Sequence, residues 1–162
     1  MISRVATGAD AAAIAVIYND GIADRVATFE TRPRTTDEVR AWLDGRHPVV
    51  VVEEDGRIVA FASSSTYRPR DCYSGIAEFS VYTARDGRRR GYGRAALEAL
   101  FVEAERAGFW KLVSRVFVEN TASRALLAQT GFREVGVYQR HGRLDGRWRD
   151  VVIVEKLLGP AA

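Results

Sequence analysis

The sequence predicts a mixed α/β fold, in which a largely antiparallel central sheet of about seven strands carries helices on both faces. Apolar residues recur with helical spacing in some segments and form short strand-like runs in others. The pair Asp55-Gly56 lies between two apolar runs, which predicts a tight hairpin and therefore antiparallel neighbours. The 162 residues suffice for one domain with a proper core, so we expect a single domain over residues 1–162.

Capping and turn residues place the elements of the first half. Thr7 with Asp10 resembles a helix N-cap, and Thr35 with Glu38 forms a capping box. The segment 22–34 has no clear period and is expected to be a connection. The expected elements are a strand at 2–5, a helix with apolar positions from Ala11 to Tyr18, a helix through Trp42-Leu43 closed by Gly45, and strands at 49–52, 58–67 and 75–83.

The second half continues the alternation of helices and strands. Leu97, Leu100 and Ala104 follow helical spacing, and Gly131 lies where a helix would end. The expected elements are a helix at 95–107, a strand at 111–118, a helix at 121–129, and strands at 134–139 and 148–156 around a turn at 144–146. This order of elements is compatible with one mixed sheet between two layers of helices.

Composition and charge narrow the function. The net charge of +3 comes from 24 basic and 21 acidic residues, and the basic clusters at 85–94 and 140–149 suit an anionic cofactor better than a nucleic-acid groove. No stretch approaches the roughly 20 apolar residues of a spanning helix, so we expect a cytoplasmic protein without membrane contact. Cys72 is the only cysteine, which excludes an intrachain disulfide. His47 and His141 look peripheral, and no metal site is expected.

The most informative stretch is 78–94, where a strand-like run enters a turn rich in Arg and Gly and then a helix. Gly91 and Gly93 permit a ligand to approach the backbone closely, and the free N–H groups at a helix start favour an anion such as phosphate. The spacing matches neither the dinucleotide fingerprint nor the phosphate loop that ends in Gly-Lys-Ser/Thr, so nucleotide hydrolysis is disfavoured. The alternative is an ordinary strand-to-helix turn, which also needs glycine.

This Arg-x-x-Gly-x-Gly turn between a strand and an amphipathic helix resembles the acetyl-CoA pyrophosphate loop of the GNAT acetyltransferase superfamily. Further segments resemble one branch, the phosphinothricin and methionine sulfoximine acetyltransferases with the related arsinothricin acetyltransferases, over nearly the whole chain. These segments are Ile17-Tyr18-Asn19, Ala27-Thr28-Phe29-Glu30, Trp42-Leu43, Glu78-x-Ser80-Val81-Tyr82, Asn120-x-x-Ser123, Gly131-Phe132 and Gly146-Arg147-Trp148-x-Asp150. The resemblance implies the GNAT fold and acetyl-CoA as the acetyl donor.

The resemblance also implies how acetyl-CoA is held. The strand that carries Val81 is expected to bulge and to splay from the next strand, so that backbone N–H groups near Val81 face the acetyl carbonyl. Asn120 matches the family's contact to the cofactor arm, and its alternative role as a helix N-cap can hold at the same time. The residues expected to bind the cofactor are Val81, Tyr82, Thr83, Arg88, Arg89, Arg90, Gly91, Tyr92, Gly93, Arg94, Asn120 and Ser123.

Glu78 matches the family's candidate general base, which is needed because the attacking amine must be uncharged. The alternative is an outward-facing carboxylate at a sheet edge. The residues expected to bind the substrate are Phe29, Glu30, Arg68, Arg70 and Tyr73. The alternatives are a surface loop whose Phe29 plugs the core, and a solvated turn in which Arg68 and Arg70 flank Pro69.

Two departures from the family limit this comparison. Leu127 occupies a position where family members often carry a histidine, and the same helix lacks the tyrosine that protonates the leaving thiolate in many GNAT enzymes. Tyr138 or a water could substitute. Relatives commonly form homodimers, to which the apolar run 151–158 could contribute; the alternative is an internal strand without partner contact.

The expected function is acetyl-CoA-dependent N-acetylation of the free amine of a small glutamate-like amino acid, giving resistance or detoxification. Candidate substrates are phosphinothricin, methionine sulfoximine and arsinothricin. Two alternatives stay open. One is acetylation of another small amine or of a protein N-terminus, and the other is a CoA-binding module without turnover.

Overall fold

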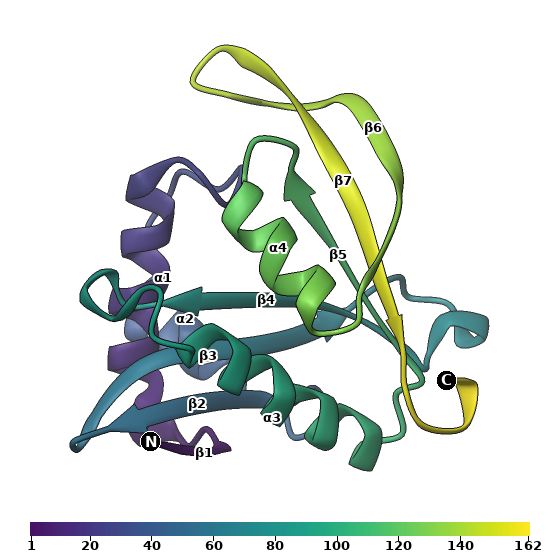
Figure 1. The fold of residues 1–162 in the computed structure, drawn as a ribbon. Helices are drawn as coiled ribbons and strands as arrows, with labels where there is room; N and C mark the ends of the chain where they lie inside the picture. Colours follow the sequence, from purple (N-terminus) through teal and green to yellow (C-terminus); the bar gives the residue numbers. More distant parts are fainter.

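A seven-stranded sheet runs through the computed structural model, which describes residues 1–162 (Figure 1). Its strand order is β1-β2-β3-β4-β5-β7-β6. All neighbouring strands are antiparallel except β4 and β5, which are parallel. The strands are β1 (Ile2–Val5), β2 (Val49–Glu54), β3 (Arg57–Thr66), β4 (Ile76–Thr83), β5 (Lys111–Phe117), β6 (Arg133–Leu144) and β7 (Arg147–Leu157). The predicted fold class and number of strands are confirmed.

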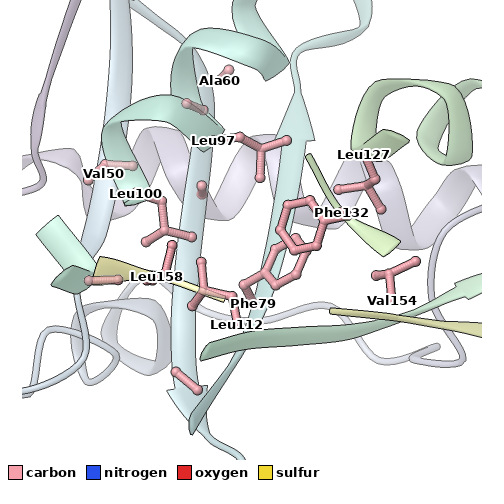
Figure 2. Packing of buried hydrophobic residues seen from close by; sticks show 14 of the residues in the cluster. Val50, Ala60, Phe79, Leu97, Leu100, Leu112, Leu127, Phe132, Val154 and Leu158 are labelled. Carbon is pink, nitrogen blue, oxygen red and sulfur yellow. The ribbon is translucent and has the colours of Figure 1, made fainter. Parts of the chain in front are cut away.

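Helices cover both faces of the sheet: α1 (Ala11–Asp24), α2 (Thr36–Arg40), α3 (Tyr92–Arg106) and α4 (Thr121–Gln129). Leu97 and Leu100 of α3 are fully buried in the larger core cluster, which also holds Phe79 of β4 (Figure 2). Ile14 of α1 and Phe61 of β3 belong to a second cluster, on the opposite face. None of the helices has the length and apolar character needed to cross a membrane.

Helix α1 runs further than the sequence indicates. The predicted helix has apolar positions from Ala11 to Tyr18, but α1 continues to Asp24, and Arg25 then adopts a left-handed φ of 60°. Gly21 lies inside the helix, and the Tyr82 ring packs against it. The site requires glycine because a Cβ atom there would lie 2.6 Å from ring carbon Cε1. This glycine permits close packing of α1 on β4 and does not end the helix.

Helix α2 is shorter than expected. The predicted capping box is present, with the Glu38 N–H donating to Thr35 Oγ1 at 3.1 Å. The helix ends at Arg40, and Trp42 and Leu43 lie in the turns that follow, where both pack against the cluster of Ile14 and Phe61. Their apolar contacts therefore reflect packing after the helix end and not a further helical turn.

The C-terminal hairpin is longer than expected and projects beyond the rest of the sheet (Figure 1). Strand β6 continues past residue 139 to Leu144, with an irregular register between Tyr138 and Gly142. It forms an edge of the sheet and is mostly exposed, whereas β7 lies between β5 and β6. Val151, Val152 and Val154 are consequently buried inside the protein. Most of the run 151–158 lies in an internal strand, which was the alternative prediction for this run.

Strands β4 and β5 separate soon after they begin. They pair at only three positions, the last being Glu78 with Val113, and then diverge (Figure 1). The expected splay is therefore confirmed. The expected bulge is wrong, because β3 and β4 pair without a shift of register from Ala60–Thr83 to Thr66–Ala77. The divergence alone opens the sheet.

Candidate active site

The divergence of β4 from β5 exposes backbone groups in the middle of the sheet. The Ala84 N–H donates to the Val59 carbonyl at 2.8 Å, which fixes the residues of β4 that bond to β3. Because antiparallel pairs alternate, the N–H and C=O groups of Phe79 and Val81 point away from β3, toward β5. Ser114 Oγ donates to the Phe79 carbonyl at 2.9 Å. The Val81 N–H faces the gap beyond the last β4–β5 pair, as the family resemblance implied.

A narrow groove of about 60 Å³ follows this gap. Val81, Tyr82, Asn120 and Ser123, all expected at the cofactor, line it together with Ala27, Phe79, Ser80, Ser114, Arg115, Val116 and Leu127. Asn120 also caps α4, because its Oδ1 accepts from the Ser123 N–H at 3.2 Å. Both roles predicted for Asn120 are therefore compatible. The groove is a slot between two strands and a helix, which suits a thin, extended ligand arm.

Helix α3 begins at the end of this groove. Gly91 is its N-cap with φ of 84°, and a Cβ atom there would meet nothing within 4 Å. The first bond of the helix runs from the Ala95 N–H to the Gly91 carbonyl at 3.1 Å, so the N–H groups of Tyr92, Gly93 and Arg94 lack helical acceptors. An open helix N-terminus of this kind fits a pyrophosphate.

Gly93 and the remaining loop residues have different surroundings. A Cβ atom at Gly93 would lie 3.2 Å from Leu126 Cδ2 and 3.4 Å from Thr83 Oγ1, so Gly93 permits close packing of α3. Arg89 has a left-handed φ of 64°. The Arg90 guanidinium lies over the Tyr92 ring at 5.7 Å.

Part of the loop's positive charge is already paired within the protein. Arg88 and Arg85 both bind the Asp24 carboxylate, each at 2.7 Å. The hydrogen bond from Arg85, followed by that from Arg88, lowers the pKa of Asp24. Arg94 pairs with Glu98 one turn further along α3, at 2.8 Å. The loop arginines therefore include residues that anchor the loop as well as residues open to a ligand.

A second, larger cavity of about 350 Å³ opens on the face of the sheet that carries α1. Cross-strand partners Ser63 and Ser80 contribute to its floor. The other lining residues are Tyr18, Arg34, Trp42, Asp44, His47, Ser64, Ser65 and Thr66. Ser80 contributes to the lining of this cavity and also to that of the groove.

His47 belongs to this cavity wall, which corrects the expectation that it is peripheral. Its Nδ1 lies 2.6 Å from Asp44 Oδ2, and its Nε2 lies 3.5 Å from Thr66 Oγ1. Desolvation opposes ionisation of Asp44, but the hydrogen bonds from the backbone and ring of His47 and from the Arg46 N–H lower its pKa to about 2. Asp44 is therefore a carboxylate at neutral pH and fixes the ring orientation of His47.

Glu78 points to the same face of the sheet as Ser80, two residues away. Its Oε1 accepts from the Arg115 guanidinium at 2.6 Å, and the other guanidinium nitrogen of Arg115 lies 3.4 Å from His141 Nε2. The side chain is 31% exposed, on a central strand. The sheet-edge alternative for Glu78 is therefore wrong, and His141 is linked to this carboxylate through Arg115.

None of the predicted substrate residues belongs to the lining of the cavity. Phe29 packs edge-on against Phe117 at 4.9 Å in a small third cluster, as its core-plug alternative predicts. Glu30 is exposed and pairs with Arg34 at 2.8 Å. Arg34 itself is mostly buried and lines the cavity, so Glu30 is one contact removed from that space.

Arg68, Arg70 and Tyr73 share a loop between β3 and β4. Each guanidinium lies over a tyrosine ring, Arg68 over Tyr67 at 5.1 Å and Arg70 over Tyr73 at 5.7 Å. The two tyrosine rings meet edge to face at 5.8 Å. The loop follows directly on Thr66 of the cavity wall, and none of its residues lines the cavity. Exposed Cys72 lies in the same loop, as expected for an ordinary loop residue.

Sequence reasoning missed most of the polar cavity. Arg34, Asp44 and His47 lie outside regular elements, so no period marks them. One signal was available: three consecutive serines from Ser63 to Ser65 continue an apolar strand, and hydroxyl groups in the middle of a sheet call for partners.

Comparison with known proteins shows clear similarities. Residues 16–132 match the model of the acetyltransferase (GNAT) family. The chain is 36% identical to a phosphinothricin N-acetyltransferase of Alcaligenes faecalis over 160 residues, which is 96% of this chain and 81% of the relative. It is 32% identical to an L-methionine sulfoximine/L-methionine sulfone acetyltransferase of Pseudomonas paraeruginosa over 162 residues, which is 97% of this chain and 94% of the relative.

Solved structures agree with this assignment of the fold. A GNAT superfamily phosphinothricin acetyltransferase from Sinorhizobium meliloti in complex with acetyl-CoA has a TM-score of 0.90 and 28% identity, covering 99% of this chain and 90% of the other. A ribosomal-protein-alanine N-acetyltransferase from Brucella melitensis has a TM-score of 0.92 and 33% identity, covering 98% and 100%.

The N-terminus of α3 generates a first prediction. Gly91→Val should abolish binding of acetyl-CoA while the protein stays folded, because a side chain would occupy the open space above the free N–H groups. Calorimetric titration with acetyl-CoA measures this. Gly108→Val is the matched control, since Gly108 has a similar φ of 90° and equally open surroundings at the far end of α3. An unchanged affinity in folded Gly91→Val would refute the docking site.

Proposed function

Since the chain belongs to the GNAT acetyltransferase family and is an acetyl-CoA-dependent N-acetyltransferase, we propose that its acceptor is the free amine of a small glutamate-like amino acid. Phosphinothricin, methionine sulfoximine and arsinothricin are the candidate substrates, and the biological role is detoxification or resistance. The names of two relatives, phosphinothricin N-acetyltransferase and methionine sulfoximine acetyltransferase, support this choice of substrate.

One observation supports the proposal most directly: the polar cavity and the narrow groove share Ser80 in their linings. The groove and the α3 N-terminus suit the extended arm and the pyrophosphate of acetyl-CoA. The cavity, at about 350 Å³, falls within the usual size of small-molecule sites and is lined by hydroxyl, imidazole and guanidinium groups. We propose that a small polar amino acid binds there with its amine directed toward Ser80, on the face of the sheet that also carries Glu78.

Acetyl-CoA supplies an activated thioester carbonyl when it is bound. In the proposed reaction Glu78 removes a proton from the substrate ammonium, whose reference pKa of about 7.7–8.0 makes this a modest task for a carboxylate. The amine nitrogen then bonds to the carbonyl carbon, the carbon–sulfur bond breaks, and the second proton of the nitrogen passes to the departing sulfur, so that CoA leaves as the thiol. The Val81 N–H, which faces the gap, donates to the oxygen on which negative charge develops.

A protein N-terminus is the second candidate acceptor, favoured by the similarity to the ribosomal-protein-alanine N-acetyltransferase. A screen of free amino acids and short peptides with acetyl-CoA, detecting released CoA, separates the candidates. We expect fast release with phosphinothricin, methionine sulfoximine or arsinothricin and slow release with peptides. The opposite preference would overturn the proposed substrate class, and the absence of release with any amine would favour a CoA-binding module without turnover.

The role of Glu78 gives a second prediction. Glu78→Gln should lower kcat by about 10²–10⁴-fold, the usual contribution of a positioned base, with little change in the affinity for acetyl-CoA. Steady-state rates across neutral pH provide the measurement. Glu103→Gln serves as the control, because Glu103 pairs with Arg106 near the C-terminal end of α3, away from the groove. A Glu78→Gln variant with the wild-type rate throughout would place the base elsewhere.

A third prediction concerns the basic loop after β3. We propose that Arg68 or Arg70 binds the distal acidic or polar group of the substrate, because a planar guanidinium offers two parallel hydrogen bonds. Arg68→Ala or Arg70→Ala should raise KM for the amino acid severely and leave KM for acetyl-CoA nearly unchanged. Varying each substrate separately measures this, with Arg106→Ala as the control. A normal amino-acid KM in both loop variants would assign the distal group to other residues.

A fourth prediction concerns assembly. We propose a homodimer, supported by the edge strand β6, which carries exposed Val135, Val137 and Tyr138. The run 151–158 is mainly buried in the sheet, so β6 replaces it as the main candidate contact. Light scattering at micromolar concentration should show twice the chain mass of 18.0 kDa. Observation of the single chain alone would reject the dimer.

A further inference from the structure

Arg115 is a cation beside Glu78 that has no part in the reaction proposed above. It extends from β5 across the point where β4 diverges, and it also lines the groove. One guanidinium nitrogen lies 2.6 Å from Glu78 Oε1, and another lies 3.4 Å from His141 Nε2. Three strands thus place a carboxylate, a guanidinium and an imidazole together beside Ser80.

A paired carboxylate and guanidinium are complementary to a zwitterion. An α-amino acid carries an ammonium and a carboxylate on one carbon, so each of its charges can replace one partner of the Glu78–Arg115 pair. We propose that Arg115 binds the α-carboxylate of the acceptor amino acid while Glu78 receives its ammonium. The fork of the guanidinium suits this role, because two of its N–H groups can bind one carboxylate.

The surroundings of the pair allow such an exchange. Arg115 is 48% exposed and Glu78 is 31% exposed, so a ligand can reach both charges. Exposed ion pairs contribute little net stability, and the fold therefore loses little when the pair separates. In the free protein, Glu78 and Arg115 neutralise each other. In the complex, the substrate ammonium pairs with Glu78 and the substrate carboxylate pairs with Arg115. Binding of the carboxylate to Arg115 also releases Glu78 from its partner, which leaves it free to accept the proton.

This inference rests on the proposed function and makes it more specific. Arg115 would bind the α-carboxylate of the substrate, and Arg68 or Arg70 would bind its distal group. A peptide N-terminus has an amide in place of the α-carboxylate, so Arg115 would find no anion there. The acceptor class is therefore free α-amino acids, and the discriminating group is the carboxylate next to the amine.

The test compares an amino-acid substrate with its α-carboxamide, which keeps the amine and side chain but lacks the charge. Wild-type protein should favour the free acid in kcat/KM by about 10- to 100-fold, the range expected for hydrogen bonds to a charged group. Arg115→Gln should lose most of this preference through a higher KM for the acid, whereas Arg115→Lys should retain part of it. Calorimetric titration with acetyl-CoA checks that the groove still binds.

Arg133→Gln is the matched control, because Arg133 pairs with Glu155 across neighbouring strands at the same 2.6 Å, outside the groove and the cavity. It should keep the wild-type preference. Equal rates for acid and carboxamide in wild-type protein, or an unchanged preference in folded Arg115→Gln, would overturn the role of Arg115 and leave the proposed function standing. Failure of wild-type protein to acetylate either compound would overturn the proposed function itself.

Discussion

The site depends on the early separation of two parallel strands. Beyond Glu78, β4 no longer pairs with β5, although it still pairs with β3. The backbone groups on the β5 side of β4 therefore need other hydrogen-bond partners. Ser114 supplies a hydroxyl to the Phe79 carbonyl, and the buried Phe79 ring packs on Phe132 at 4.8 Å, which secures this part of β4. The next N–H along the strand, that of Val81, is left facing the groove. The early end of the β4–β5 pairing therefore leaves a backbone hydrogen-bond donor that a ligand can use.

The two faces of the sheet also carry different chemical groups. On the face covered by α3 and α4, glycines and free N–H groups suit the phosphates and the extended arm of the donor. On the face covered by α1, serines, Arg34 and the Asp44–His47 pair suit a small polar acceptor. Side chains alternate along β4, so Ser80 and Val81 serve opposite sides. In the proposed reaction, donor and acceptor meet next to Ser80, where β4 and β5 separate.

Sequence patterns predicted the fold class, most element boundaries, the Asn120 cap and the strand–loop–helix at 78–94. These features are local, because capping residues, turn glycines and periodicity act within a few residues. The errors come from long-range packing. Gly21 lies beyond the apolar positions that predict the first helix, but it is inside α1 and contacts the Tyr82 ring. His47 and Arg115 have no local signature, since their contacts form only when β3, β4 and β5 bring distant residues together.

The pairing of Arg85 and Arg88 with Asp24 has a consequence for selectivity among polyanions. A free cluster of arginines at a helix start would attract nucleic acid as well as a cofactor, because such attraction depends mainly on the number of unpaired charges. Asp24, at the end of α1, neutralises part of that cluster while the open N–H groups of α3 remain. This pairing lowers the attraction of the loop for a long polyanion, which responds to net charge, and leaves the open N–H groups that we propose for the pyrophosphate.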